Sequence, residues 1–193
     1  PQTIDGHKVV AIGEGAFKGT CLVNVTIPDT VTEIGDSAFE DCKQLSSVSL
    51  SSNLTELGSS AFSNCTSLTS IRIPKSLERA DAGVSGDYAP FKGCTILSDV
   101  ELESGMTKIP ANLLRDCPGF TTIAIPDTVT EIGDSAFEDC KQLSSVSWSS
   151  KLTELGSSVF SNCTSLTSIR IPDTVTDMGD HVFSGCTELK EVT

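Results

Sequence analysis

The chain has 193 residues, of which 38% are hydrophobic and 20% are charged, and its formal net charge is −13 at pH 7. Such an acidic chain does not suit a nucleic-acid backbone or an anionic membrane surface, because both require a basic patch. No apolar run approaches the ~18 residues that a membrane-inserted helix needs. The chain begins at Pro1 without a signal peptide, so we expect a processed or trimmed N-terminus.

A short segment recurs along the whole chain with a period close to 23 residues. Six copies contain the unit Phe-x-x-Cys. A period in the twenties is typical of a solenoid, in which each unit buries its apolar edge against its neighbours. Phe17 and Cys21 open the series slightly out of step. The predicted structural ladder is Phe39/Cys42, Phe62/Cys65, Phe91/Cys94, Phe137/Cys140, Phe160/Cys163 and Phe183/Cys186, with Leu114/Cys117 filling the same slot with Leu.

The eight cysteines raise the question of a disulfide framework. They occur once per repeat, in the same phase as Phe, as expected for an interior position. Stacked strands lie about 4.8 Å apart, whereas a disulfide needs Cβ atoms about 3.8 Å apart with converging directions. We therefore predict free, buried thiols. Disulfides remain the alternative, and the cysteines leave the redox compartment open.

Residues 39–62 illustrate one turn of the coil. Val48 and Leu50 are expected to point inward in a short strand, because the serines between them alternate to the other side. The chain then returns along the opposite side, where Gly58 is expected to permit a turn. The inward strand positions are Val25/Ile27, Val48/Leu50, Ile71/Ile73, Val100/Leu102, Ile123/Ile125, Val146/Trp148 and Ile169/Ile171.

The pattern Ala-Phe-x-x-Cys-x-x-Leu-x-x-Val-x-Leu, followed by Leu-Gly, resembles the BspA-like leucine-rich repeats. It is seen at Ala38-Phe39…Cys42…Leu45…Val48…Leu50 and again in the other copies, over essentially all 193 residues. The resemblance implies a right-handed, mainly β coil with short turns, about eight repeats of ~23 residues and a parallel sheet on its concave face. It also implies display on bacterial or protist surfaces, adhesion, and no catalysis or cofactor.

We expect residues 1–193 to form a single array of such repeats. Residues 27–74 and 125–172 form a duplicated block, and an insertion of six residues falls at about 80–90. The chain stops inside a predicted strand at Val192-Thr193, so we expect it to be a fragment of a longer protein. The two blocks differ only at Leu50/Trp148, Asn53/Lys151 and Ala61/Val159.

Candidate binding residues stand where the repeat pattern is broken. Tyr88 and Asp87 lie in the insertion, and insertions in solenoids become loops in which binding residues concentrate; the alternative is a tolerated surface insertion. On the predicted concave face, which carries mostly hydroxyl groups, Arg72 beside Glu101 is the best candidate contact, and a solvated polar sheet is the alternative. The other charged candidates on this face are Asp99 and Arg170.

Trp148 occupies a slot that is otherwise Leu or Ile. We interpret it as an oversized core residue tilted toward an edge, with an exposed aromatic contact as the alternative. The two histidines, His7 and His181, lie at opposite ends of the array. No metal-ligand spacing and no nucleophile motif occurs, so no catalytic residue, metal site or cofactor is predicted.

The leading hypothesis is a non-enzymatic binding module at the cell surface or outside the cell. Its partner would be a host-derived protein or glycan, rather than nucleic acid or a membrane interior. The alternatives are a passive spacer and the targeting domain of a larger enzyme. Within the array, the unique segment around Tyr88 and Glu101 is favoured over the repeated surface as the place of specificity. The oligomeric state is left open.

Overall fold

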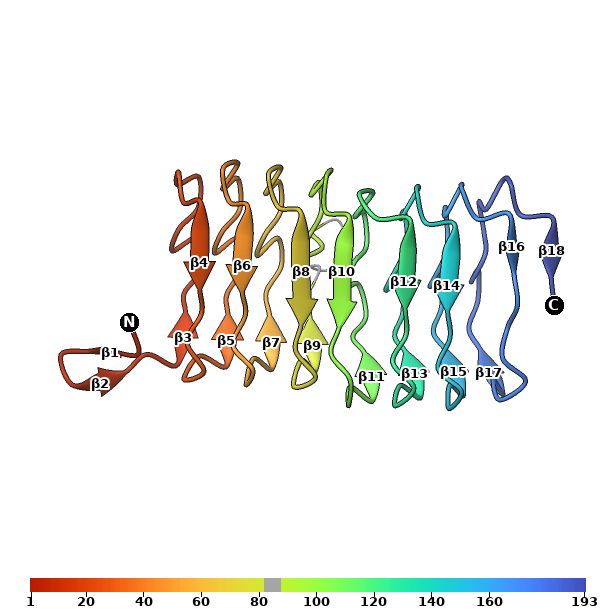
Figure 1. Ribbon diagram of the computed structural model, residues 1–193, viewed down its shortest axis with the longest axis horizontal. Coiled ribbons are helices and arrows are strands. Elements are labelled where there is room, and N and C mark those ends of the chain that lie inside the picture. Colours follow the sequence, from red (N-terminus) through yellow and green to blue (C-terminus); the bar gives the residue numbers. More distant parts are fainter. Residues whose placement is uncertain (82–87) are drawn as a thin grey trace.

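The computed structural model describes residues 1–81 and 88–193. Within this part of the chain the polypeptide winds into successive turns of about 23 residues, without any helix. Figure 1 shows the turns side by side along the long axis, with the two ends of the chain at opposite ends of the array. The expected repeat solenoid is therefore confirmed. A small antiparallel hairpin, β1 (Thr3–Ile4) and β2 (His7–Lys8), precedes the first turn.

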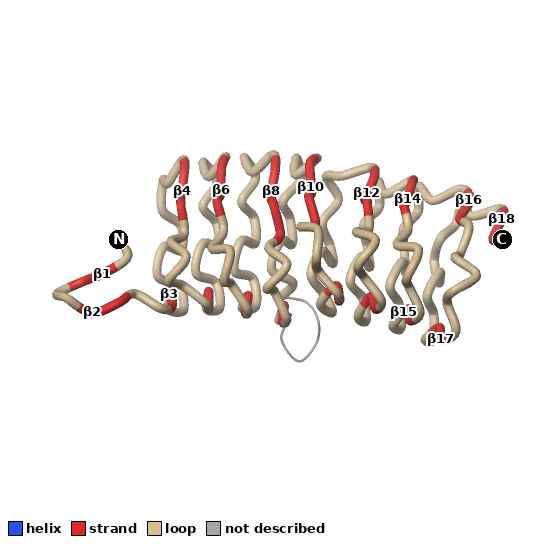
Figure 2. Tube along the Cα trace, turned by 60° about the horizontal axis from the view of Figure 1, so that its bottom comes forward, coloured by secondary structure: helices blue, strands red, loops and turns tan. Residues whose placement is uncertain are grey.

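Each turn contributes one strand to each of two rows, which run along different edges of the coil (Figure 2). The long-strand row consists of β4 (Asn24–Thr26), β6 (Ser47–Ser49), β8 (Ser70–Ile73), β10 (Asp99–Leu102), β12 (Thr122–Ala124), β14 (Ser145–Ser147), β16 (Ser168–Ile169) and β18 (Glu191–Val192). The short-strand row consists of β3 (Ala11–Ile12), β5 (Glu33–Ile34), β7 (Glu56–Leu57), β9 (Arg79–Ala80), β11 (Lys108–Ile109), β13 (Glu131–Ile132), β15 (Glu154–Leu155) and β17 (Asp177–Met178).

All pairing within these rows is parallel. The short-strand row forms two four-stranded sheets, β3-β5-β7-β9 and β11-β13-β15-β17, and the break between β9 and β11 coincides with the insertion. The long-strand row pairs as β4-β6, β8-β10, β12-β14 and β16-β18. The pairing of β8 with β10 spans the insertion and places Arg72 opposite Glu101. The long-strand row therefore joins the two parts of the array across the insertion.

The core is a column of stacked phenyl rings. Neighbouring rings lie 5.0 to 5.8 Å apart, with interplanar angles between 2° and 11°. The predicted ladder is confirmed, because its members are buried except Phe183 and Cys186, which are half-buried. The two stacks are Phe17-Phe39-Phe62-Phe91 and Phe137-Phe160-Phe183.

Between the two stacks, Leu114 and Phe120 exchange the usual residue types. Leu114 takes the Phe slot, and Phe120 takes the slot three residues after Cys117 that is Leu in the neighbouring repeats, for example Leu97 and Leu143. Both Leu114 and Phe120 are fully buried. Volume-conserving swaps are tolerated best in cores, so the ring lost at Leu114 is restored within the same turn at Phe120. Sequence reasoning treated Leu114 as an isolated exception.

The thiols form a second ladder beside the rings. The eight cysteines are free, as predicted. Six of them donate a hydrogen bond to the main-chain oxygen of the Phe slot one turn earlier, with distances from Sγ to oxygen of 3.0 to 3.3 Å. Each such thiol therefore links its turn to the preceding one. The donors are Cys42, Cys65, Cys94, Cys140, Cys163 and Cys186.

Every turn also contains a residue with left-handed backbone one position before its cysteine, or two positions before it at Cys21. Its φ lies between 58° and 74°. Gly, Asn and Asp tolerate this conformation best, and only these three types occur there. The sequence pattern contained this signal, but it was not recognised. The residues are Gly19, Asp41, Asn64, Gly93, Asp116, Asp139, Asn162 and Gly185.

Gly58 is needed for a reason other than the one expected from the sequence. Its φ is not in the left-handed region. A Cβ added at Gly58 would instead lie 2.6 Å from the main-chain nitrogen of Asp36 and 2.6 Å from the carbonyl carbon of Gly35. Successive turns approach so closely here that a side chain has no space, and this close approach is the reason that the position requires glycine.

Candidate functional site

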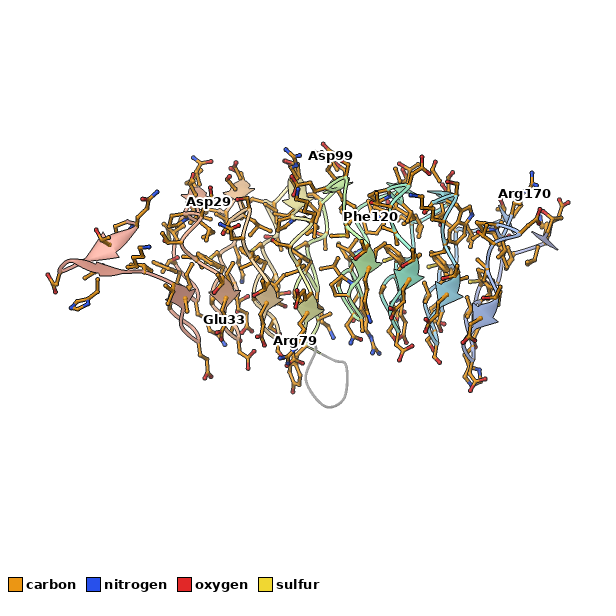
Figure 3. The ribbon with its side chains drawn as sticks, turned by 90° about the horizontal axis from the view of Figure 1, so that it is seen from below. Asp29, Glu33, Arg79, Asp99, Phe120 and Arg170 are labelled. Atoms are coloured by element: carbon orange, nitrogen blue, oxygen red, sulfur yellow. The ribbon has the colours of Figure 1, made fainter. Side chains whose placement is uncertain are left out.

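The outward face of the long-strand row is the surface on which most of the candidate residues lie. Because side chains alternate along a strand, one set of each strand faces the core and the other faces solvent. The exposed set is mostly Ser and Thr, as expected. The candidates Arg72, Asp99, Glu101 and Arg170 are all exposed on this row, and Figure 3 labels Asp99 and Arg170 at well-separated places along it.

Arg72 forms the charged centre of this face. Its Nε lies 3.4 Å from an oxygen of Glu101, and its Nη2 lies 3.4 Å from Oε1 of Glu103. Parallel register brings Arg72 opposite Glu101, so the predicted neighbourhood of these two residues is confirmed. Glu103 was missed, although the alternation of β10 continued by two residues would have placed it on the same face.

Glu103 is held in place from its other side. The main-chain N–H of Lys75 donates to Oε2 of Glu103 at 2.9 Å, and the side chain of Glu103 is only 25% exposed. The side chains of Arg72 and Glu101 are 61% and 60% exposed. The guanidinium is thus fixed between two carboxylates while remaining accessible to solvent.

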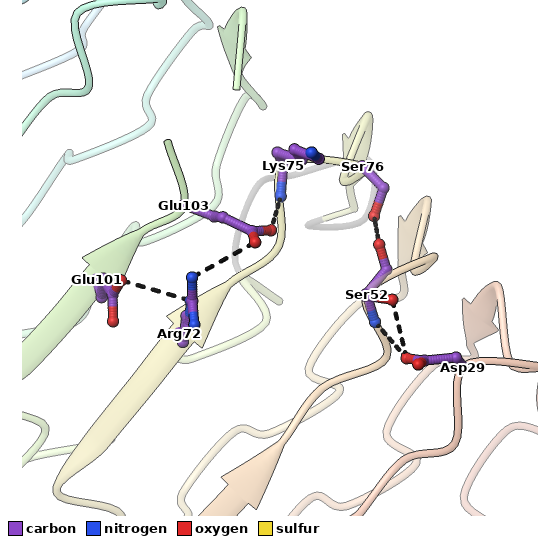
Figure 4. A network of polar contacts seen from close by, with 7 residues as sticks. All are labelled: Asp29, Ser52, Arg72, Lys75, Ser76, Glu101 and Glu103. Carbon is purple, nitrogen blue, oxygen red and sulfur yellow. Dashed lines mark hydrogen bonds and ion pairs between the residues drawn. The ribbon is translucent and has the colours of Figure 1, made fainter. Parts of the chain in front are cut away.

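The polar contacts continue toward the N-terminal turns (Figure 4). The hydroxyl of Ser76 donates to the main-chain oxygen of Ser52 at 2.9 Å. Ser52 in turn donates from its main-chain nitrogen and its hydroxyl to Oδ1 of Asp29, at 2.8 and 3.0 Å. These two hydrogen bonds lower the pKa of Asp29 below its usual value. Four consecutive turns are therefore connected at this edge of the row.

A groove of about 240 Å³ lies between β6 and β8, beside Arg72. Its apolar part comes from residues that are buried or half-buried, whereas hydroxyl, guanidinium and carboxylate groups surround it. We call it the Arg72 groove. It is lined by Val48, Ser49, Leu50, Ser52, Arg72, Pro74 and Glu103.

The charge around the Arg72 groove is negative. Glu103 lines the groove, Glu101 contacts Arg72 and Asp29 contacts Ser52, so three carboxylates stand against the two cations Arg72 and Lys75, a formal charge of −1. Arg72 is engaged by two of the carboxylates. A site with this balance does not attract an anion.

Arg170 occupies the equivalent position in the second block, but its surroundings differ. The register of β16 with β18 places Thr193 where Glu101 stands opposite Arg72. No ion pair of Arg170 is seen in the part of the chain that the structure describes. Arg170 lies four strand steps from Arg72, roughly 19 Å at the usual spacing. The structure therefore does not bring the two arginines together.

Tyr88 lies on a different side of the coil from Arg72. Its main-chain oxygen accepts a hydrogen bond from the N–H of Ser60, in a turn that leads into the phenyl column. Its side chain is 56% exposed. Tyr88 and the charged cluster therefore lie on two separate surfaces. Asp87 lies outside the described residues.

Trp148 packs edge-on against Phe160, with ring centroids 5.7 Å apart and an interplanar angle of 84°. It is half-buried against the core, so its interpretation as an oversized core residue is confirmed. His7 lies in β2, before the first turn, and His181 follows β17 near the other end of the array. Over residues 1–81 and 88–193 no group of three or more His, Cys, Asp or Glu could hold a metal ion. The same residues contain no helix that is long and apolar enough to cross a bilayer.

The fold and its polar face define a parallel β-solenoid of short leucine-rich repeats. The sequence profile of the BspA type leucine rich repeat region matches residues 6–84 and 86–192, in six copies. The chain belongs to this family.

Solved structures support the same assignment. The Treponema pallidum leucine-rich repeat protein TpLRR is 32% identical, with a TM-score of 0.69 over 86% of this chain and 75% of the other. A leucine-rich repeat protein from Bacteroides ovatus is 27% identical, with a TM-score of 0.56 over 96% of this chain and 58% of the other. One from Eubacterium ventriosum is 25% identical, with a TM-score of 0.53 over 96% of this chain and 57% of the other. Among curated proteins no match was found.

Proposed function

We propose that the array is a non-enzymatic binding module of a surface-displayed or secreted protein, and that it mediates adhesion to a host protein or glycan. Membership of the BspA-type family supports a repeat module that binds a partner. The observation that carries the proposal is the Arg72 cluster. A guanidinium held by two carboxylates stands beside a groove, on a face that otherwise bears small hydroxyl groups.

Stability alone does not account for this cluster. Exposed ion pairs contribute about 0–1 kcal/mol to folding, and Arg170 keeps its place in the second block without such a pair. A fixed, accessible Arg is instead typical of residues that dominate binding at interfaces. Tyr88 is a second, separate candidate contact, because it is an exposed aromatic residue on the turn side.

The proposal is tested by comparing Arg72→Ala with Arg170→Ala in binding to immobilised extracellular-matrix proteins and to a glycan array. Both variants are expected to melt within a few degrees of the parent protein. Arg72→Ala should weaken binding at least about tenfold, equivalent to ~1.4 kcal/mol, whereas Arg170→Ala should change it less than about twofold.

Equal losses in both variants would show that the cluster has no special role. If the parent protein binds neither a matrix protein nor a glycan, the function as a binding module is refuted and a spacer role is favoured. A Tyr88→Ala variant in the same series reports on the second surface.

A further inference from the structure

The duplicated block provides an internal comparison for the Arg72 groove. Of 48 matched positions only three differ between the copies. Ala61 and Val159 are both fully buried and do not line the groove. The other two differences fall within four residues of each other, at the end of the strand that borders the groove: Leu50/Trp148 and Asn53/Lys151.

The first of these differences changes the volume of the site. Leu50 lines the groove, and it is half-buried. At the equivalent place Trp148 lays its larger ring edge-on against Phe160. Phe62, the counterpart of Phe160, is likewise stacked between its neighbours. Because the surrounding sequence is the same, a Trp at position 50 would extend into the space that is open beside Leu50.

The second difference changes the charge. Asn53 is exposed, and its Nδ2 donates to the main-chain oxygen of Asp29 at 2.9 Å. Lys151 places a cation at the same position in the second copy. Thr193 stands in the place of Glu101 and Asp173 in the place of Lys75, so the second copy differs in the placement of its charges as well as in space.

The size and charge of the Arg72 groove indicate what it would hold. Its volume of about 240 Å³ is below the ~300–1,000 Å³ of typical small-molecule pockets, which suits one side chain of a larger partner. Lysine and arginine have apolar stems and cationic ends. The apolar part of the groove fits such a stem, and the carboxylates of Asp29, Glu101 and Glu103 around it fit its end. No aromatic ring lines the groove to stack on a sugar.

We propose that the Arg72 groove receives a lysine or arginine side chain of a protein partner. Leu50 leaves this groove open, whereas the larger Trp148 closes the equivalent site in the second copy. This inference rests on the proposed binding function and specifies its ligand.

The test uses amide chemical shifts of the ¹⁵N-labelled full chain during titration with the peptide Ac-Gly-Lys-Gly-NH₂. Peptides with norleucine or glutamate at the central position, and N-acetylglucosamine, are the comparison probes. The lysine peptide should shift the amides of Ser49 and Ser52, with an affinity that falls as salt increases. The glutamate peptide and the sugar should leave these amides unchanged.

Three variants transfer the natural differences from the second copy to the first. Leu50→Trp should weaken the lysine peptide at least about tenfold. Asn53→Lys should weaken it several-fold without affecting the norleucine peptide, because it changes only charge. Ala61→Val is the matched control and should leave the titration unchanged. Because the second block contains all three residues, each variant is compatible with the fold.

Lysine-peptide shifts that persist in Leu50→Trp, or groove shifts caused by the sugar alone, would overturn the inference. If Leu50→Trp still binds the host protein as tightly as the parent, the binding function stands and the groove is refuted. If the parent binds no host partner but the lysine peptide still occupies the groove, the groove chemistry stands and the proposed function fails.

Discussion

The close approach of successive turns predicts an unusual response to Gly156→Ala. At an ordinary site with compatible φ, Gly→Ala stabilises a protein by about 0.4–1 kcal/mol, because it restricts the unfolded chain. A Cβ at Gly156, however, would lie 2.5 Å from Oδ1 and 2.6 Å from the main-chain nitrogen of Asp134, and 2.8 Å from the carbonyl carbon of Gly133. Main-chain atoms cannot move aside as a flexible side chain can, so the turns must separate.

Separation of the turns should outweigh the entropic gain. Overpacking costs about 1–3 kcal/mol, so we expect a net destabilisation of roughly 1–2 kcal/mol. Urea unfolding followed by circular dichroism measures this difference. The effect should also be local, because solenoid turns contact only their neighbours. The amide of Ser157, which donates to Oδ1 of Asp134 at 2.6 Å, should therefore exchange faster with solvent.

The same ladder provides the control. Gly13 has no atom within 4 Å of an added Cβ, and Gly35 is intermediate, with its nearest contact at 3.0 Å. Gly13→Ala should be neutral or stabilising, and Gly35→Ala should fall between Gly13→Ala and Gly156→Ala. Equal effects at the three positions, or stabilisation by Gly156→Ala, would refute the close-approach explanation.

Two further predictions concern the core. Burial raises the pKa of Cys65, Cys94, Cys117, Cys140 and Cys163 above the ~8.5 of an unfolded Cys, so the folded state retains protons that the unfolded state releases. The contribution of thiol burial to the free energy of unfolding should be fully present below about pH 8.5 and should decrease above it. Cys140→Ala should reduce the slope of the free energy of unfolding against pH by ~1.4 kcal/mol per pH unit. An unchanged slope would contradict thiol burial. Leu114→Phe and Phe120→Leu should each destabilise by roughly 1–3 kcal/mol, while the double variant loses less than their sum; additive losses in urea unfolding would show that the two residues do not compensate.

The repeat architecture was determined by the sequence alone, because its signals are local. Alternation of apolar and polar residues places Val48 inward, and a constant period then stacks equivalent residues of successive turns. The same counting rule brought Arg72 beside Glu101, as the structure has them. It also predicted free thiols, because parallel turns keep equivalent cysteines a strand spacing apart.

Contacts between turns were decided only by the tertiary structure. At the six-residue insertion the pairing between β9 and β11 is lost, whereas β8 and β10 remain paired. The sequence of a single repeat does not indicate which of the two rows loses its pairing. Tyr88 lies in a turn beside Ser60, whereas Arg72 lies in β8 of the long-strand row. The groove beside Leu50 and the need for glycine at Gly58 depend on the distance between neighbouring turns. That distance results from the packing of all the side chains between the turns, and it has no signature in any single repeat.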